Sequence, residues 1–234
     1  VDLEVGDEEV VAIVGASGCG KTTLLRMVAG LTTPTQGAVH VDGRHVWHDG
    51  RPDREVIDRL AVVFQDPNLL PWFSIEDNIA LPLRMRGVAR PERLAKAREL
   101  CAFTGLAGFE KMLPAALSGG MRQRAALARA LVASPRLVLL DEPFASLDAL
   151  TRDAMNLELQ RIWQQKPSTT IVVTHSIAEA VMLADRVIAL TPRPARIAGT
   201  VDVGFDRPRS LELQGTSTFQ ELVGRVRGHL QDAS

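Results

Sequence analysis

One stretch near the amino end constrains this chain more than any other feature of its sequence. It fits the pattern G-x-x-x-x-G-K-[ST] and comprises Gly15, Ala16, Ser17, Gly18, Cys19, Gly20, Lys21, Thr22 and Thr23. Glycines at these positions allow positive φ angles and let backbone N–H groups approach phosphate oxygens closely. Lys21 is suited to reach the β- and γ-phosphates of a nucleotide, and the Thr22 hydroxyl is suited to hold Mg²⁺. The stretch therefore predicts a phosphate-binding loop.

The flanking residues supply the context that this motif needs. Residues 10–14 form a short apolar, β-branched run that predicts a buried strand, and residues 24–30 predict a helix closed by a C-cap glycine. The positive end of that helix dipole adds to an anion site at the loop. An ordinary glycine turn between a strand and a helix is the alternative, and the four fixed positions of the motif argue against it.

The composition limits the class of protein. With 234 residues, 46% of them hydrophobic, the chain is long enough for one large domain or for a core domain with a subdomain. A net charge of −1 lacks the basic footprint of a nucleic-acid-binding protein. Two cysteines indicate a reducing compartment, and we recognise neither a membrane-spanning run nor a secretion leader, so we expect a soluble, cytoplasmic protein. Only 14 residues precede the loop, so we expect N-terminal sequence to be missing.

Four further apolar runs predict buried strands, and three of them end in polar residues. Burying the adjacent acids Asp141 and Glu142 at a strand end is costly unless a cation or a chemical task requires them. The runs, with the polar residues that follow them, are 60–64 with Gln65, 137–140 with Asp141 and Glu142, 171–174 with His175, and 187–190.

The block of residues 69–117 carries helical patterns and no strand signal, so we interpret it as a helical subdomain inserted into a sheet domain. Within it, Pro82 interrupts a helix over 76–85, and a second helix over 91–101 begins near Pro91. Elsewhere the sequence predicts a hairpin strand over 37–43, loop and connecting structure over 44–58, surface histidines at His40, His45 and His48, amphipathic helices over 149–165 and 177–184, a small terminal hairpin near 199–201, and a final helix over 219–231.

A second glycine-rich helix start lies at Ser118, Gly119 and Gly120. Ser118 is a suitable N-cap, and the alanine-rich run that extends to residue 133 is strongly helical. By the same dipole argument, this helix start is a second candidate anion site. A capped helix with two incidental glycines is the alternative.

Together these motifs resemble the nucleotide-binding subunit of an ABC (ATP-binding cassette) transporter, over residues 10 to about 190. The most specific part is residues 117–123, Leu-Ser-Gly-Gly-Met-Arg-Gln, which resembles the ABC signature about 100 residues after the phosphate-binding loop. The resemblance implies a single α/β domain with the P-loop NTPase fold, whose core sheet is mostly parallel. It implies a RecA-like core with an antiparallel β subdomain over 1–68 and 134–234, and an inserted helical subdomain over 69–133.

The resemblance also implies a role for each motif residue in binding and hydrolysing ATP. Glu142 is expected to polarise the attacking water, His175 to contact the γ-phosphate, and Gln65 to touch both Mg²⁺ and the water. We therefore expect Glu142, His175 and Gln65 to be catalytic, and Thr22, Gln65 and Asp141 to hold Mg²⁺. These roles suit phosphoryl transfer, which needs positioning and charge neutralisation more than covalent chemistry. The expected ATP contacts are the nine loop residues with Gln65, Ser118, Gly119, Gly120 and His175.

In this family the signature of one subunit closes over ATP held by the loop of another. The resemblance therefore implies a homodimer with Ser118, Gly120 and Asp148 at its seam. ATP binding is expected to close the two halves and hydrolysis to release them, which drives an attached membrane protein. Taken singly, Gln65 and His175 also fit ordinary polar strand ends, and Asp148 also fits a helix N-cap.

Within the family, residues 64–66, 69–72, 77–79 and 174–180 resemble the nitrate/sulfonate/taurine group of importers. This implies a separate membrane permease, a periplasmic solute-binding protein, a peripheral position on the cytoplasmic face of the inner membrane, and no nucleic acid. Residues 69–73 are expected to receive the permease, although Trp72 and Phe73 also fit a subdomain core.

Other functions fit parts of the pattern. An ABC exporter or lipid-transport ATPase subunit is the main alternative. A non-transport ABC ATPase acting on DNA or ribosomes is disfavoured by the balanced charge, and a catalytically inactive binding module by intact Lys21, Asp141, Glu142 and His175. The chain has no tyrosine, and the residue that stacks on adenine stays unassigned.

Overall fold

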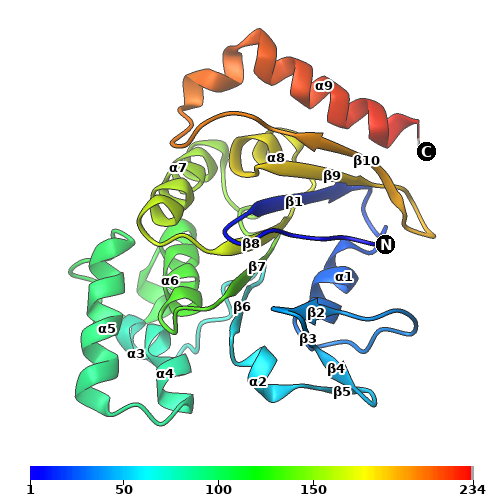
Figure 1. The fold of residues 1–234 in the computed structure, drawn as a ribbon. Helices are drawn as coiled ribbons and strands as arrows, with labels where there is room; N and C mark the ends of the chain where they lie inside the picture. Colours follow the sequence, from blue (N-terminus) through cyan, green and yellow to red (C-terminus); the bar gives the residue numbers. More distant parts are fainter. Residues whose placement is uncertain (233–234) are drawn as a thin grey trace.

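The computed structural model describes residues 1–232, and its centre is a six-stranded sheet of order β10-β9-β1-β8-β7-β6 (Figure 1). Every neighbouring pair in this sheet is parallel except β9 and β10, which confirms the predicted mostly parallel core. The strands are β1 (Val10–Gly15), β6 (Leu60–Val63), β7 (Leu137–Asp141), β8 (Thr169–Val173), β9 (Arg186–Leu190) and β10 (Ile197–Asp202).

Both faces of the sheet are covered, which explains why its strands are continuous apolar runs. Along β1, Val11 and Ile13 pack in one cluster with Leu25 of α1 (Lys21–Val28). Val10, Ala12 and Val14 pack on the other face, which is covered by helices that follow in the chain. These helices are α6 (Gly119–Leu131), α7 (Ala149–Gln165), α8 (Ile177–Leu183) and α9 (Ser217–Gln231).

The prediction of loop over residues 44–58 was wrong, because this stretch contributes to two small hairpins and a short helix. The elements are β2 (His40–Val41), β3 (Arg44–His45), β4 (Trp47–His48), β5 (Arg51–Pro52) and α2 (Arg54–Ile57). Each hairpin turns at an Asp-Gly pair with positive φ, at Asp42-Gly43 and Asp49-Gly50. That pair is a strong signal for a two-residue hairpin, and the mixed charge around it concealed the signal.

The helical block contains α3 (Ile75–Ile79), α4 (Leu81–Met85), α5 (Arg90–Phe103) and a 3₁₀ turn, η1 (Pro114–Ala116), beside α6. The predicted break in the first helix exists, but it falls at Ala80. Pro82 lies in the first turn of α4, where a missing N–H costs nothing. The boundaries 69–133 of the helical subdomain stay a prediction.

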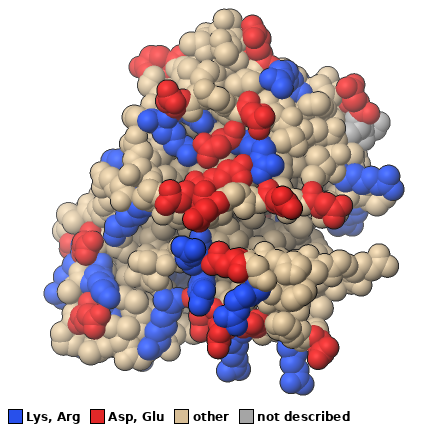
Figure 2. Space-filling model, in the orientation of Figure 1, with Lys and Arg blue, Asp and Glu red and all other residues tan. Residues whose placement is uncertain are grey.

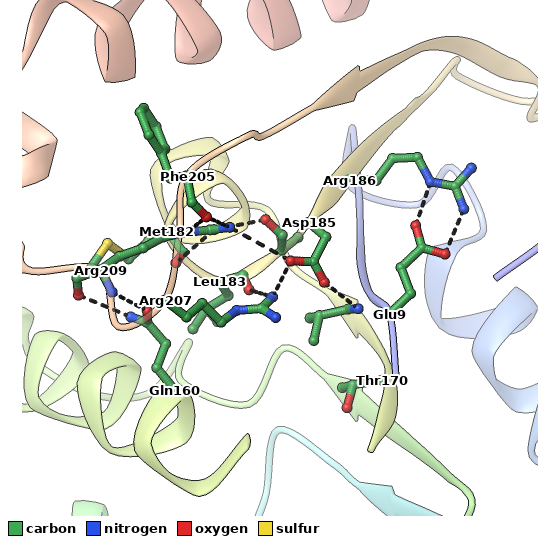
Figure 3. A network of polar contacts seen from close by, with 12 residues as sticks. Glu9, Gln160, Thr170, Met182, Leu183, Asp185, Arg186, Phe205, Arg207 and Arg209 are labelled. Atoms are coloured by element: carbon green, nitrogen blue, oxygen red, sulfur yellow. Dashed lines mark hydrogen bonds and ion pairs between the residues drawn. The ribbon is translucent and has the colours of Figure 1, made fainter. Parts of the chain in front are cut away.

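The carboxyl-terminal segment is tied to the sheet by a buried polar network (Figure 3). The predicted terminal hairpin is formed by β9 and β10, so it extends the core sheet. After it, the Arg209 side chain, 2% exposed, donates to three carbonyl oxygens at the end of α8. Asp185 accepts from the backbone N–H of Val10 and pairs with Arg207. After Arg209 the chain continues through η2 (Leu211–Gly215) into the final helix α9, which buries the predicted apolar face.

Acidic and basic side chains are mixed over the face of the molecule drawn in Figure 2. Neither sign covers that face by itself, in keeping with the net charge of −1.

Candidate active site

Four of the predicted motifs follow four neighbouring parallel strands. The glycine-rich loop follows β1, His175 follows β8 after Thr174, Glu142 follows β7, and Gln65 follows β6 after Phe64. Because the carboxyl ends of parallel strands lie at one edge of a sheet, the fold gathers these segments there. Gln65 itself is exposed, and the carbonyl of the preceding Phe64 accepts a hydrogen bond from Gln123 of α6 at 3.4 Å.

Three glycines of the loop occupy positions where a side chain would be strained or would clash. Gly18 and Gly20 have φ values of 77° and 115°, and Gly20 is the N-cap of α1. A Cβ on Gly15 would lie 2.9 Å from Cys19 Sγ and 3.1 Å from the carbonyl oxygen of Leu190. Larger residues would therefore open the loop, which begins at the end of β1 and leads directly into a helix N-terminus.

Lys21 and Thr22 hold the loop in place from its far end. Lys21 is 5% exposed, and its Nζ donates to the carbonyl oxygens of Gly15 at 2.8 Å and Ala16 at 3.1 Å. The Thr22 hydroxyl donates to Oδ1 of Asp141 at 2.9 Å. Burial raises the pKa of Asp141, while the Thr22 hydrogen bond lowers it and the charge of Glu142 raises it further. A nearby cation would relieve this cost of burying the carboxylate.

Glu142 and His175 lie in direct contact. Oε2 of Glu142 is 3.0 Å from Nδ1 of His175, and the Glu142 side chain is 25% exposed while that of His175 is 61% exposed. Glu142 has φ of 47°, an uncommon conformation for a residue with a side chain. Its backbone N–H donates to the carbonyl of Val173 at 2.8 Å, which fixes this turn against β8. The two predicted catalytic residues are thus held within proton-transfer distance of each other.

The second glycine-rich helix start forms a separate group with Asp148. Ser118 caps α6 by accepting from the Met121 N–H at 3.3 Å. A Cβ on Gly120 would lie 2.7 Å from Cγ2 of Thr151, so this position has no room for a side chain. Thr151 in turn donates to Asp148 through its N–H at 3.0 Å and its hydroxyl at 2.7 Å.

Asp148 is therefore the N-cap of α7, and the Thr151 bonds lower the pKa of its carboxyl. Ser118, Gly119 and Asp148 are all exposed. Within residues 1–232, no hydrogen bond or ion pair joins Ser118, Gly119 or Gly120 to the phosphate-binding loop. The structure thus presents two groups of predicted ATP contacts, one at the sheet edge and one at the start of α6.

Comparison with known proteins decides the family. The family described as ABC transporter matches residues 1–145. The chain belongs to the ABC transporter family of ATP-binding proteins. It is 47% identical over 207 residues to the taurine import ATP-binding protein TauB of Burkholderia thailandensis, a match that covers 88% of this chain and 77% of that protein. It is 43% identical over 212 residues to the bicarbonate transport ATP-binding protein CmpC of Synechococcus elongatus, with coverage of 89% and 31%.

The solved structures agree. A dimeric, post-hydrolysis structure of the ATP-binding cassette MJ0796 with ADP and Pi matches with a TM-score of 0.75 and 31% identity, covering 88% of this chain and 90% of that one. These matches confirm the predicted P-loop ABC fold, the resemblance to the nitrate/sulfonate/taurine group, and an ATP-binding, ATP-hydrolysing protein. None of the helices in residues 1–232 is long and apolar enough to cross a membrane. The roles of individual site residues stay predictions.

The sequence analysis assigned no role in the site to three residues near His175. Thr174 and Glu179 are buried beside the histidine loop, and Arg152 of α7 donates to carbonyls of the segment that leads to Asp148. Glu179 belongs to the stretch 174–180 that carried the family resemblance, but by itself it is a single acid in a short helix, which a solvent-facing position explains equally well.

Proposed function

We propose that this chain energises the uptake of a small solute of the nitrate, sulfonate or taurine type through a separate membrane permease, by binding and hydrolysing ATP. The supporting observation is the joint arrangement of the loop, the acid pair and His175 at one sheet edge, in a chain 47% identical to a taurine import ATP-binding protein. Two of the relatives are named for the solutes taurine and bicarbonate, which are small and zwitterionic or anionic. Relatives named for import favour uptake over the exporter alternative.

The loop binds the phosphates of ATP. The Lys21 ammonium is buried and holds two loop carbonyls, which phosphate oxygens can replace with stronger, charge-assisted bonds. The residues also fit Mg²⁺, because the Thr22 hydroxyl and the Asp141 carboxylate supply oxygen ligands 2.9 Å apart, with Gln65 after the neighbouring strand. When bound, Mg²⁺ neutralises the charge that develops on the β- and γ-phosphates.

Glu142 acts on the water that attacks the γ-phosphate. Its carboxylate accepts a proton from that water, and the 3.0 Å contact with His175 holds it in one orientation. The His175 side chain is largely exposed and can contact a phosphate oxygen of the bound nucleotide. Lys21 remains on the leaving phosphate side and offsets the charge that accumulates there.

Two copies of the chain form the working unit. Ser118, Gly120 and Asp148 form the seam, so that the exposed start of α6 in one subunit covers ATP held by the loop of the other. The separation of the two groups within one chain supports this arrangement, as does the dimeric form of the MJ0796 cassette. Binding of ATP then closes the dimer and hydrolysis opens it.

The permease docks on the segment that follows Gln65. Trp72 is 69% exposed, so the alternative of a subdomain core does not apply to this side chain. The buried Asn78 side chain fixes the segment: its Oδ1 accepts from the Leu70 N–H at 2.7 Å, and its Nδ2 donates to the carbonyls of Leu70 and Phe73 at 3.1 Å. A rigid loop that displays a tryptophan is suited to a protein partner. In the proposed complex the chain lies peripherally at the cytoplasmic face of the inner membrane, and a periplasmic solute-binding protein delivers the solute.

Purification of the chain from native membranes in mild detergent, followed by mass spectrometry, tests this function. We expect a multi-span permease in equal amount, with a solute-binding protein beside it. Trp72→Ser is expected to lose the permease and to retain ATP hydrolysis in the free chain. Leu150→Ser, at a position 83% exposed, is the matched control and should keep the permease. Co-purification of ribosomal or DNA-bound proteins instead of a permease would overturn the transport function and leave the ATPase intact.

A further inference from the structure

Behind the exposed His175 lies a buried carboxylate that the hydrolysis described above does not use. Glu179 of α8 is 6% exposed, and its Oε2 accepts from the Thr174 hydroxyl at 3.2 Å. Its other oxygen, Oε1, is buried and has no hydrogen-bond partner among residues 1–232. A buried carboxylate with a free oxygen is costly, so a structural role alone is better served by an apolar residue at this position.

The contacts of Glu179 hold the two residues that flank His175 in the sequence. The Thr174 hydroxyl, besides donating to Glu179, accepts from the Ser176 N–H at 3.0 Å. The Ser176 hydroxyl accepts from the Glu179 N–H at 3.2 Å and caps α8. Residues immediately before and after His175 are therefore both held by Glu179, one through its carboxylate and the other through its backbone.

The charged groups around Glu179 belong to the same site. Burial raises the pKa of Glu179 to about 6, while the Thr174 bond and the charges of Arg152 and His175 lower it, and that of Glu142 raises it. Arg152 comes from α7, where it donates to the carbonyl oxygens of Phe144 at 3.4 Å and Leu147 at 2.8 Å. Glu179 thus lies between the histidine loop and the segment that leads to Asp148.

The geometry points to Glu179 as a positioning residue for ATP hydrolysis, which holds His175 against Glu142 through its hydrogen bond from Thr174. This inference rests on the proposed role of His175 and is independent of the transported solute. Because the His175 ring is largely exposed, few other contacts restrain it, and release of Thr174 would let the loop leave Glu142. Small displacements of groups that orient a reacting water cost up to about 100-fold in rate.

Three variants of the full chain test the inference by steady-state ATP hydrolysis and by ADP binding. Glu179→Leu removes the acceptor at similar size, Glu179→Gln keeps an acceptor oxygen for Thr174, and Thr174→Val removes the donor. We expect kcat to fall about 10- to 100-fold in Glu179→Leu and Thr174→Val, with ADP affinity and the KM for ATP within about twofold of wild type. Glu179→Gln should keep most of the wild-type kcat. The double variant Glu179→Leu, Thr174→Val should lose no more than Thr174→Val alone, because Thr174→Val already removes the bond to Glu179 together with the bond from the Ser176 N–H.

The imidazole NMR signal of His175, assigned with His175→Ala, gives a second readout that needs no turnover. We expect one sharp signal in wild type and Glu179→Gln, and a broadened or displaced signal in Glu179→Leu. Wild-type kcat in Glu179→Leu, or equal losses in the Leu and Gln variants, would overturn the inference. If His175→Ala keeps full turnover, the proposed role of the histidine fails, and a sharp, unmoved signal in Glu179→Leu would separately refute the positioning contact.

Discussion

The two glycine-rich helix starts of this molecule use the same dipole in opposite settings. At the start of α1, Gly20 is the N-cap, with no side chain to satisfy the free N–H groups, and the adjacent Lys21 is buried. At the start of α6, the Ser118 side chain caps the helix, and Ser118 and Gly119 are exposed. These features support the proposal that the first start binds the phosphates of ATP, with Lys21 as the cation.

The second start has neither a buried cation nor an uncapped end. It is a surface without a side chain at Gly120, because Thr151 packs against this glycine and in turn hydrogen-bonds Asp148. In the proposed dimer, this surface would meet ATP that the loop of the second subunit already holds. Under the proposed function, the first start neutralises phosphate charge and the second closes the dimer.

The largest expected effect tests the chemistry at the sheet edge. Glu142→Gln removes the proton acceptor and keeps the size and the contact with His175. We expect turnover to fall about 10²- to 10⁴-fold while ATP binding persists, so that an ATP-bound dimer accumulates. Gel filtration with ATP should show the dimer, and wild type without ATP is the control. A monomer alone in the presence of ATP would count heavily against the division of work between two copies.

The next effect tests the cation that distinguishes the first start. Lys21→Ala removes the ammonium that now holds the Gly15 and Ala16 carbonyls. We expect the affinity for ATP to fall about 10- to 100-fold, because charge-assisted hydrogen bonds to phosphate are lost. Titration with fluorescent ATP measures the change, and Lys96→Ala, at an exposed lysine of α5, is the matched control. Equal affinity in both variants would reject the phosphate-loop assignment.

How much of this the sequence could predict depends on the range of the interactions. The strands, the loop and the polar strand ends were predictable because they are encoded in short apolar runs and fixed spacings. The position of the break at Ala80 was not predictable from the sequence. A proline in the first turn of a new helix costs nothing, and in a sequence it cannot be distinguished from a proline that interrupts a helix. The two hairpins were encoded in Asp-Gly pairs, a local signal that the charge pattern concealed.

Other features of the site depend on residues distant in sequence. Gly120 must be small because Thr151 lies above it, 31 residues later in the chain. Glu179 is buried, and the groups that act on it, Thr174, Arg152 and Glu142, come from other segments, so an isolated helix sequence does not reveal that environment. Sequence motifs therefore identified the residues expected to touch ATP, and the fold was needed to find the residues that support them.

A smaller effect tests the surface of the second start. Gly120→Ala places a Cβ 2.7 Å from Cγ2 of Thr151, so we expect a loss of about 1–3 kcal/mol in the free energy of unfolding or in dimer closure. Thr151→Ser removes that methyl group and keeps the hydroxyl that donates to Asp148. The double variant should recover most of the loss, as measured by urea unfolding and by dimerisation of the Glu142→Gln background with ATP. A double variant as impaired as Gly120→Ala would show that the close approach to Thr151 is not the reason for the glycine.

The last prediction distinguishes the two regions by the pH dependence of the free energy of unfolding. Burial raises the pKa of Glu179 to about 6 from its ordinary 4.5, so folding favours its protonated form. The stability that this form contributes is fully present below pH 4.5 and is lost as the pH rises through about 6, where the buried group ionises. Glu179→Gln removes this titration, so its free energy of unfolding relative to wild type should rise by about 2 kcal/mol between pH 4.5 and pH 7.5. Urea unfolding at a series of pH values measures the difference. Because Ser118, Gly119 and Gly120 do not titrate, Gly120→Ala should show a pH-independent difference from wild type over the same range, and a parallel slope in the two variants would remove Glu179 as the source.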